Sequence, residues 1–140
     1  MPELPEVETV RRGLERVIIG KTIAGIRVHE TRFRFPVQPK LLRKWIARQS
    51  IVAVERRAKY VLCCMSNDAR LVIHLGMSGR LLWCHGSLPL EKHDHIQFLL
   101  DDGDELRFRD PRRFGLIDAI APGKLDEYVH FRHLGLEPLS

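Results

Sequence analysis

The apolar positions of this chain follow a helical period at its start. Leucine, valine and isoleucine recur at spacings of three and four, at Leu4, Val7, Val10, Leu14, Val17 and Ile18. This period predicts an amphipathic helix of about four turns, which Gly20 ends. A second, shorter helix is predicted over residues 39–48, where Pro39 suits the first turn and Leu42, Trp45 and Ile46 share one side.

Elsewhere the pattern is one of short strands separated by turn residues. The first predicted strand covers residues 22–30 and is rich in β-branched side chains. Seven more are predicted at 50–55, 60–65, 71–75, 80–84, 96–101, 105–109 and 115–120. Their spacing of roughly ten residues is typical of a two-layer antiparallel β-sandwich. The predicted fold is mainly β, with an amino-terminal helix and a second short helix flanking the sandwich.

Composition indicates one globular domain. The 140 residues are 44% hydrophobic and 29% charged, which is enough for a core. No apolar run reaches membrane-spanning length and no signal peptide is visible, so we expect a soluble cytoplasmic protein without a membrane partner. Cys63, Cys64 and Cys84 lack a Cys-x-x-Cys spacing, so free thiols are expected, with two of them in the core.

The formal net charge of +5 is spread unevenly. Residues 1–60 carry 14 Lys and Arg against 6 Asp and Glu, whereas residues 61–140 carry 9 against 12. This asymmetry predicts one basic face, which alone is only a weak indication of nucleic-acid binding.

The first three residues offer a candidate nucleophile. Removal of Met1 would leave Pro2 as a secondary amine, and a terminal amine titrates near pH 8. A fraction of it would therefore be nucleophilic at neutral pH, with the Glu3 carboxyl beside it as a proton donor. The alternative is a plain helix start, because proline and acidic side chains both suit the first turn of a helix.

Two predicted turns are hard to explain as scaffold alone. Met77 stands between glycines at a hairpin tip, and a turn at Asp110 introduces Arg112 and the aromatic Phe114. An apolar tip beside an arginine suits a wedge that opens a base stack. The alternative is that Met77 and Phe114 fold back into the core.

Other charged positions have two readings each. The run of Arg56, Arg57 and Lys59 is either a phosphate-binding cluster or a solvated turn. The arginines and aromatics of residues 32–35 either touch a phosphate or cover the sheet. His93 and His95 could share one face of a strand, but no complete metal-ligand set is visible, so no metal site is predicted.

Six collinear blocks make the chain resemble the bacterial formamidopyrimidine-DNA glycosylases, which excise 8-oxoguanine and ring-opened purines. They are PELPEVET at 2–9, RRAKY at 56–60, HLGMSG at 74–79, KHDH at 92–95, DPRRFG at 110–115 and LGLEPL at 134–139.

The resemblance implies roles for particular residues. It makes Pro2 the nucleophile that forms a Schiff base, Glu3 the acid, and Lys59 a proton-transfer group in abasic-site (AP) lyase cleavage. Met77, Arg112 and Phe114 match the residues that fill the void left by an everted base, with Arg112 addressing the orphaned cytosine. His74 and His93 become DNA contacts, and Asp94 is expected to be an orienting or surface group. Met77, Arg112 and Phe114, together with the amino terminus, favour the purine-repair branch over the endonuclease VIII-like branch, which removes oxidised pyrimidines.

The resemblance also implies how the chain is organised. Residues 1–132 would form the amino-terminal catalytic domain, and 133–140 a linker toward a helix-two-turn-helix domain that the sequence lacks. The family's zinc lies in a carboxy-terminal finger, so no cofactor is expected in this segment. We expect a monomer whose partner is damaged double-stranded DNA. A truncated, noncatalytic DNA-binding module is the alternative.

Overall fold

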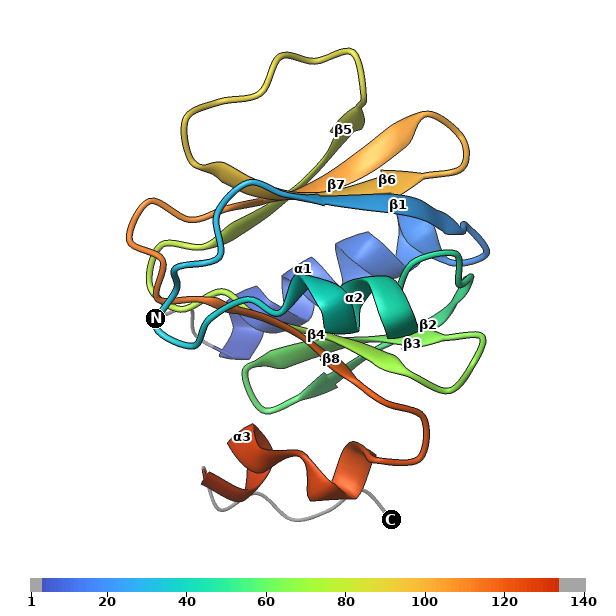
Figure 1. The fold of residues 1–140 in the computed structure, drawn as a ribbon, viewed down its shortest axis with the longest axis vertical. Helices are drawn as coiled ribbons and strands as arrows, with labels where there is room; N and C mark the ends of the chain where they lie inside the picture. The colour runs from blue at the N-terminus through green and yellow to red at the C-terminus, as the bar shows by residue number, and fades with distance from the viewer. Residues whose placement is uncertain (1–3, 134–140) are drawn as a thin grey trace.

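The computed structural model describes residues 4–133, which form two stacked four-stranded antiparallel sheets (Figure 1). One sheet has the order β1-β6-β7-β5, from strands Ile23–Val28, Asp94–Leu100, Asp104–Arg109 and Arg80–His85. The other has the order β2-β3-β4-β8, from strands Ile51–Arg57, Tyr60–Met65, Arg70–His74 and Leu116–Ile120. The predicted sandwich and all eight predicted strands are confirmed.

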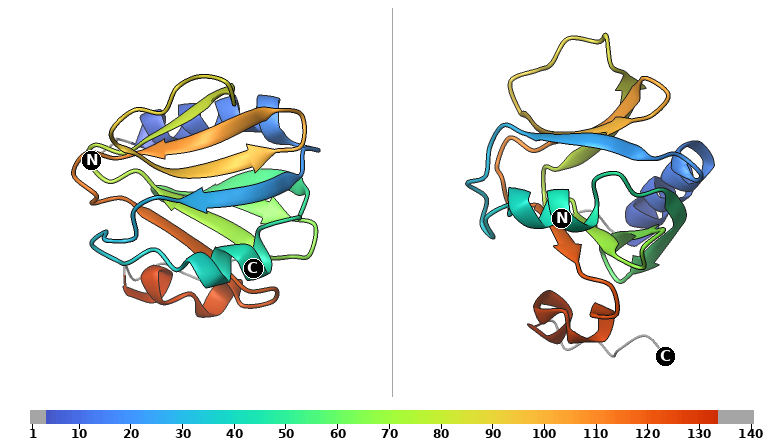
Figure 2. Two further views of the ribbon diagram at one scale, coloured as in Figure 1. Left: turned by 45° about the horizontal axis from the view of Figure 1, so that its top comes forward. Right: turned by 45° about the vertical axis from the view of Figure 1, so that its right-hand side comes forward.

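The two predicted helices close the open sides of the sandwich (Figure 2). Helix α1, Leu4–Ile18, packs against β2 and β3, and α2, Pro39–Trp45, packs against β1 and β8. The apolar stripe of α1 enters the core through Val7, Leu14 and Ile18, which are 2%, 6% and 0% exposed. Gly20 has a φ of 88° and ends the helix as predicted, because that left-handed conformation strains other residues. Helix α2 stops three residues earlier than predicted.

Alternation along the strands separates two cores. Val61, Cys63 and Met65 of β3 point into the space between the sheets, while Tyr60 and Leu62 point outward. The outward pair is covered by a 3₁₀ turn, Leu125–Glu127, and by helix α3, Val129–His133, through Tyr128 and Phe131 (Figure 1). The sequence pattern did not predict this last helical segment. Burying Tyr128 and Phe131 stabilises its docking by roughly 1.5–3 kcal/mol for each side chain.

The three cysteines are free thiols, as expected. Cys63 and Cys64 are 0% and 5% exposed, and burial raises the pKa of each to about 12, so neither is poised to react as a thiolate. Among residues 4–133, no helix is both long and apolar enough to cross a membrane.

Candidate functional site

The turns that hold most of the candidate residues meet at one end of the sandwich. Antiparallel pairing sets Tyr60 opposite His74 and His74 opposite Leu116. The β2–β3 turn with Lys59, the turn after β4 and the loop before β8 therefore lie side by side. The backbone N–H of Asp110 also bonds the His93 carbonyl at 3.1 Å, which brings the segment before β6 to the same end.

Asp110 joins two of these turns. Its carboxylate is fully buried and accepts a hydrogen bond from the Ser78 hydroxyl at 2.5 Å and another from the Gly115 N–H at 2.8 Å. The Ser78 hydroxyl oxygen in turn accepts from the Arg112 N–H at 3.4 Å. The two turns are therefore held by a buried charged acceptor, which is stronger than a neutral one. Sequence reasoning used Asp110 only as a turn signal.

Glycines allow these turns to approach each other closely. Gly76 has a φ of 59°, and a β-carbon there would lie 2.9 Å from the Phe114 carbonyl carbon. A β-carbon on Gly115 would lie 2.7 Å from the His74 carbonyl oxygen. Any side chain at either position would push the turns apart.

The structure brings Met77, Arg112 and Phe114 together on this frame. The Arg112 guanidinium carbon lies 4.8 Å from the centre of the Phe114 ring, and Nη1 lies 3.9 Å from the Met77 sulfur. Met77 is 60% exposed and Phe114 47% exposed. The alternative that both fold back into the core is therefore wrong. Together they form an exposed apolar tip beside a cation, which we call the wedge.

His74 lies behind the wedge, at the end of β4. Its Nδ1 accepts the Gly76 N–H at 3.0 Å, and its ring meets the Tyr60 ring edge-on at 4.8 Å between centroids. Burial, with the charges of Lys59 and His130 adding to it, lowers the pKa of His74. His74 is therefore neutral at pH 7, which its role as the acceptor for Gly76 requires.

The three cations near the β2–β3 turn do not act as one cluster. Arg56 donates to Glu8 of α1 at 3.0 Å, which ties the first helix to this turn. Arg57 is 7% exposed and stacks 4.5 Å from the Phe131 ring, and burial lowers its pKa. Within the described part of the chain, only Lys59 of the three has no ion-pair partner. The run is therefore neither a single phosphate-binding cluster nor a plain solvated turn.

The acidic first turn of α1 lies close to this end. Glu6 and Val10 share a hollow of about 370 Å³ with Leu75, Gly79 and Arg80. Glu8 takes bonds from Arg11, Arg56 and Arg12, which together lower its pKa to about 2. Pro2 and Glu3, the predicted nucleophile and acid, lie outside the described residues.

Asp94 and Phe33 have structural roles. Asp94 is 4% exposed and accepts from Arg109 at 2.6 Å, so the suggestion that it is a surface group is wrong. Phe33 packs on Phe108 at 5.9 Å between centroids, which agrees with the interpretation that the aromatics of residues 32–35 cover the sheet. The His93 and His95 rings lie 5.8 Å apart. Within residues 4–133, no three His, Cys, Asp or Glu side chains are placed to hold a metal ion.

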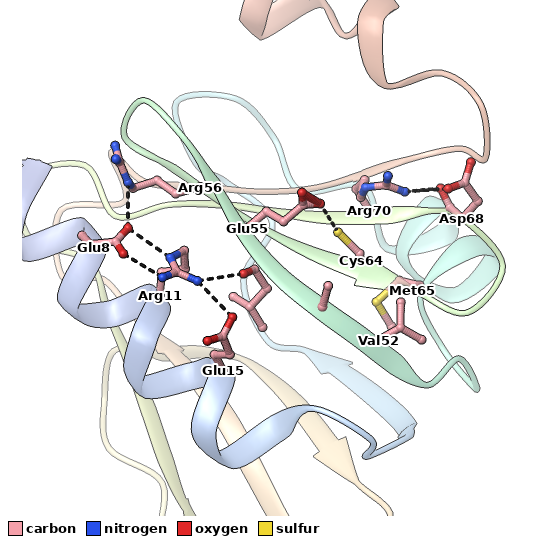
Figure 3. A pocket seen from close by; sticks show the side chains of 12 residues that line it. Glu8, Arg11, Glu15, Val52, Glu55, Arg56, Cys64, Met65, Asp68 and Arg70 are labelled. Atoms are coloured by element: carbon pink, nitrogen blue, oxygen red, sulfur yellow. Dashed lines mark hydrogen bonds and ion pairs between the residues drawn. The ribbon is translucent and has the colours of Figure 1, made fainter. Parts of the chain in front are cut away.

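A separate hollow of about 650 Å³ lies between α1 and the β2-β3-β4 face (Figure 3). Its arginines are engaged within the protein: Arg11 with Glu8 and Glu15, and Arg70 with Asp68 at 3.0 Å. Cys64 donates to Glu55 at 2.7 Å. With four carboxylates facing three arginines, this hollow is not suited to bind a phosphate.

Residues 1–117 match the family model described as the formamidopyrimidine-DNA glycosylase N-terminal domain. The chain belongs to the formamidopyrimidine-DNA glycosylase family. It is 46% identical over all 140 residues to the formamidopyrimidine-DNA glycosylase of Laribacter hongkongensis, and 44% identical to that of Salmonella dublin. These matches span 51% and 50% of the two relatives, so the chain covers about half the length of the glycosylases that it matches.

Solved structures of the Lactococcus lactis glycosylase share the fold. Its complex with DNA containing Fapy-dG superimposes with a TM-score of 0.82 at 34% identity, covering 95% of this chain and 48% of that one. Its complex with abasic-site DNA gives the same score and identity, covering 96% and 47%. This glycosylase fold has two antiparallel sheets with flanking helices, as the sequence predicted.

Proposed function

We propose that this chain is the catalytic amino-terminal part of a base-excision repair glycosylase that removes oxidised purines from double-stranded DNA and then cleaves the strand. The observation that carries the proposal is the wedge, in which Met77 and Phe114 stay exposed beside Arg112. Side chains of this kind compensate for unstacking a base step, which costs a few kcal/mol. Similarity to a glycosylase solved with Fapy-dG DNA supports the same substrate class.

In the proposed first step, the Pro2 nitrogen attacks C1′ of the damaged nucleotide. The base departs with the electrons of its bond to C1′ and takes up the proton that the Pro2 nitrogen loses. Glu3 gives a proton to the sugar ring oxygen, the C1′–O4′ bond breaks, and an iminium links the Pro2 nitrogen to C1′ of the opened sugar. Chain connectivity supports a role for Pro2 at the wedge end, because the two peptide units that join Pro2 to Leu4 span at most about 7 Å. The first turn of α1 already shares a hollow with the Gly79 turn.

In the second step, a proton leaves C2′ and the 3′ phosphate departs, which cleaves the strand. We assign proton transfer in this step to Lys59. Its turn lies at the wedge end, and no carboxylate among residues 4–133 pairs with its side-chain nitrogen, which takes up the C2′ proton in its amine form. His74 and His93 are assigned to contacts with the DNA backbone.

Strand cleavage at an abasic site tests this function. The chain should nick a duplex that contains a natural abasic site, and Lys59→Gln should slow nicking about tenfold or more, because proton transfer contributes factors of this size or larger. Lys124→Gln is the control, since Lys124 is an exposed cation that pairs with Glu127. Binding without nicking would instead favour a noncatalytic DNA-binding module.

A further inference from the structure

A second basic surface lies at the opposite end of the sandwich from the wedge. Between Glu30 and Glu55 the sequence has six Lys and Arg and no Asp or Glu. Three of these cations, Arg43, Lys44 and Arg48, line a groove of about 530 Å³ between the carboxyl end of α2 and the start of β1. No acidic side chain lines it, so the groove carries a concentrated positive charge.

Strand register separates this groove from the wedge. Gly25, which lines the groove, pairs with Leu99 near the end of β6. The wedge loop follows Arg109 of β7, which pairs with Asp94 at the start of β6. The groove and the wedge therefore lie at opposite ends of the same sheet. At about 3.3 Å per strand residue, they are roughly 17–20 Å apart.

The groove cations are not engaged with carboxylates. Arg43, Lys44 and Arg48 are exposed, and none of them forms an ion pair within the described chain. This distinguishes them from the arginines of the mixed-charge hollow in Figure 3, where Arg11 and Arg70 have acidic partners. The Lys44 Nζ lies 4.9 Å from the centre of the Trp45 ring, but cations without a carboxylate partner remain available to an external anion.

The backbone of the groove is fixed and open to close approach. The Arg48 N–H donates to the Ile23 carbonyl at 2.6 Å, and Arg48 has a φ of 69°. The backbone that carries this cation is therefore anchored to β1. Gly25 has no side chain, and Ala24 and Ala47 have only methyl groups. Ile26 and Gln49 also line the groove, so phosphates would reach the three cations over Ala24, Gly25 and Ala47, where no side chain is larger than a methyl group.

We propose that this groove is a second, lesion-independent site for the phosphate backbone of DNA. This second site rests in part on the proposed function. The groove would hold the part of a duplex that extends beyond the wedge, or a second duplex segment. Phosphate contacts of this kind release counterions and carry no sequence information. The groove would therefore increase affinity for undamaged and damaged DNA by the same factor.

The test is a titration of the 140-residue chain with a lesion-free duplex, followed by NMR at backbone amides of both sites. We expect the amides of Gly25 and Ala47 to shift, and the shifts to weaken as salt rises. The variant Arg43→Gln/Lys44→Gln/Arg48→Asn should lose these shifts and keep those at Gly76 and Gly115. Asparagine is chosen at position 48 because it tolerates a positive φ.

A charge-matched control uses Arg12→Gln/Arg16→Gln/Lys124→Gln, which removes three exposed cations elsewhere. If about two phosphate contacts form in the groove, the slope of log affinity against log salt should fall by about 1.8 in the groove variant and stay unchanged in the control.

The outcomes separate the two proposals. Shifts at Gly76 and Gly115 without shifts at Gly25 and Ala47 would overturn the groove site and leave the proposed function standing. Shifts in the groove alone would support the groove and count against the wedge as the DNA-binding end. No shifts at either end would overturn both. Equal groove shifts with a polyglutamate peptide would show a general acidic-partner site and overturn its assignment to DNA.

Discussion

The carboxylate of Asp110 accepts the Ser78 hydroxyl at 2.5 Å, which joins the turn that carries Met77 to the loop that carries Arg112 and Phe114. The side chains proposed to enter DNA are thus exposed, while the group that positions them is fully buried. A preorganised site requires buried groups that hold its contact residues in place.

Replacing Asp110 with asparagine should therefore loosen the wedge. The variant has one acceptor oxygen where Asp110 uses two, so either Ser78 or Gly115 loses its partner, at a cost of about 1–3 kcal/mol in the free energy of unfolding. Urea unfolding measures this loss. Asp102→Asn is the control, because Asp102 is a half-exposed carboxylate in the β6–β7 turn. Equal effects of the two changes would remove Asp110 from this role.

Met77→Ala separates wedge function from stability. Because Met77 is 60% exposed, the free energy of unfolding should change by no more than about 0.5 kcal/mol. Opening of the base stack should weaken, as measured by fluorescence of 2-aminopurine opposite an abasic site. Loss of stability with unchanged fluorescence would mean that Met77 serves the fold.

Arg112→Ala should reduce the preference for a lesion opposite cytosine more than it reduces overall binding. A bidentate base contact contributes about 1–3 kcal/mol of discrimination, so the preference should fall roughly 5- to 150-fold. Arg112→Lys keeps the charge and loses the planar fork, so it should restore binding but not preference. An alanine variant with unchanged opposite-base preference would exclude Arg112 from base readout.

His74 should make the fold sensitive to mild acid. Burial, together with Lys59 and His130, holds the folded-state pKa of His74 below the usual 6.5. Its stabilisation is therefore complete above pH 6.5 and is lost as pH falls toward the folded value. The free energy of unfolding should differ less between pH 7.5 and pH 5.5 in His74→Asn than in the unmodified chain. Asparagine keeps an acceptor near Gly76. The exposed His85→Asn is the control, and an identical pH dependence in both variants would contradict this account.

The sequence predicted the first two helices because their apolar positions recur every three or four residues. It predicted the strands because they are short apolar or β-branched runs separated by turn residues. Met77 and Phe114 were correctly placed in turns, but their exposure depends on packing between turns that are distant in the sequence. The same reason explains why Asp110 was missed as the joining residue. The segment with Tyr128 and Phe131 was missed because its helix is only five residues long, too short to show a helical repeat of apolar positions. The sequence also gives no sign that it packs on the outer face of a sheet.

The roles of Arg56 and Arg57 could not be predicted from the sequence. The two are adjacent in the chain, yet one bonds Glu8 of α1 and the other is buried against Phe131. A strand turns successive side chains to opposite faces, so neighbouring cations meet different partners. Lys59 lies in the turn itself and, alone of these three cations, has no ion-pair partner among residues 4–133.

Processing at the amino terminus is a condition of the proposed chemistry. If Met1 remains, the Pro2 nitrogen is locked in an amide and cannot attack. Intact-mass measurement should show a chain that lacks Met1. A mature protein that retains Met1 would rule out Pro2 as the nucleophile.

Covalent trapping with borohydride tests the central claim most directly, because only an imine between protein and sugar can be reduced to a permanent link. The chain is incubated with an abasic-site duplex and borohydride, and the adduct is mapped by mass spectrometry. The account predicts an adduct at Pro2 that disappears when the terminal amine is acetylated and persists in Lys59→Gln. An adduct that survives acetylation, or none at all from a chain that binds the duplex with its terminal amine free, would contradict it.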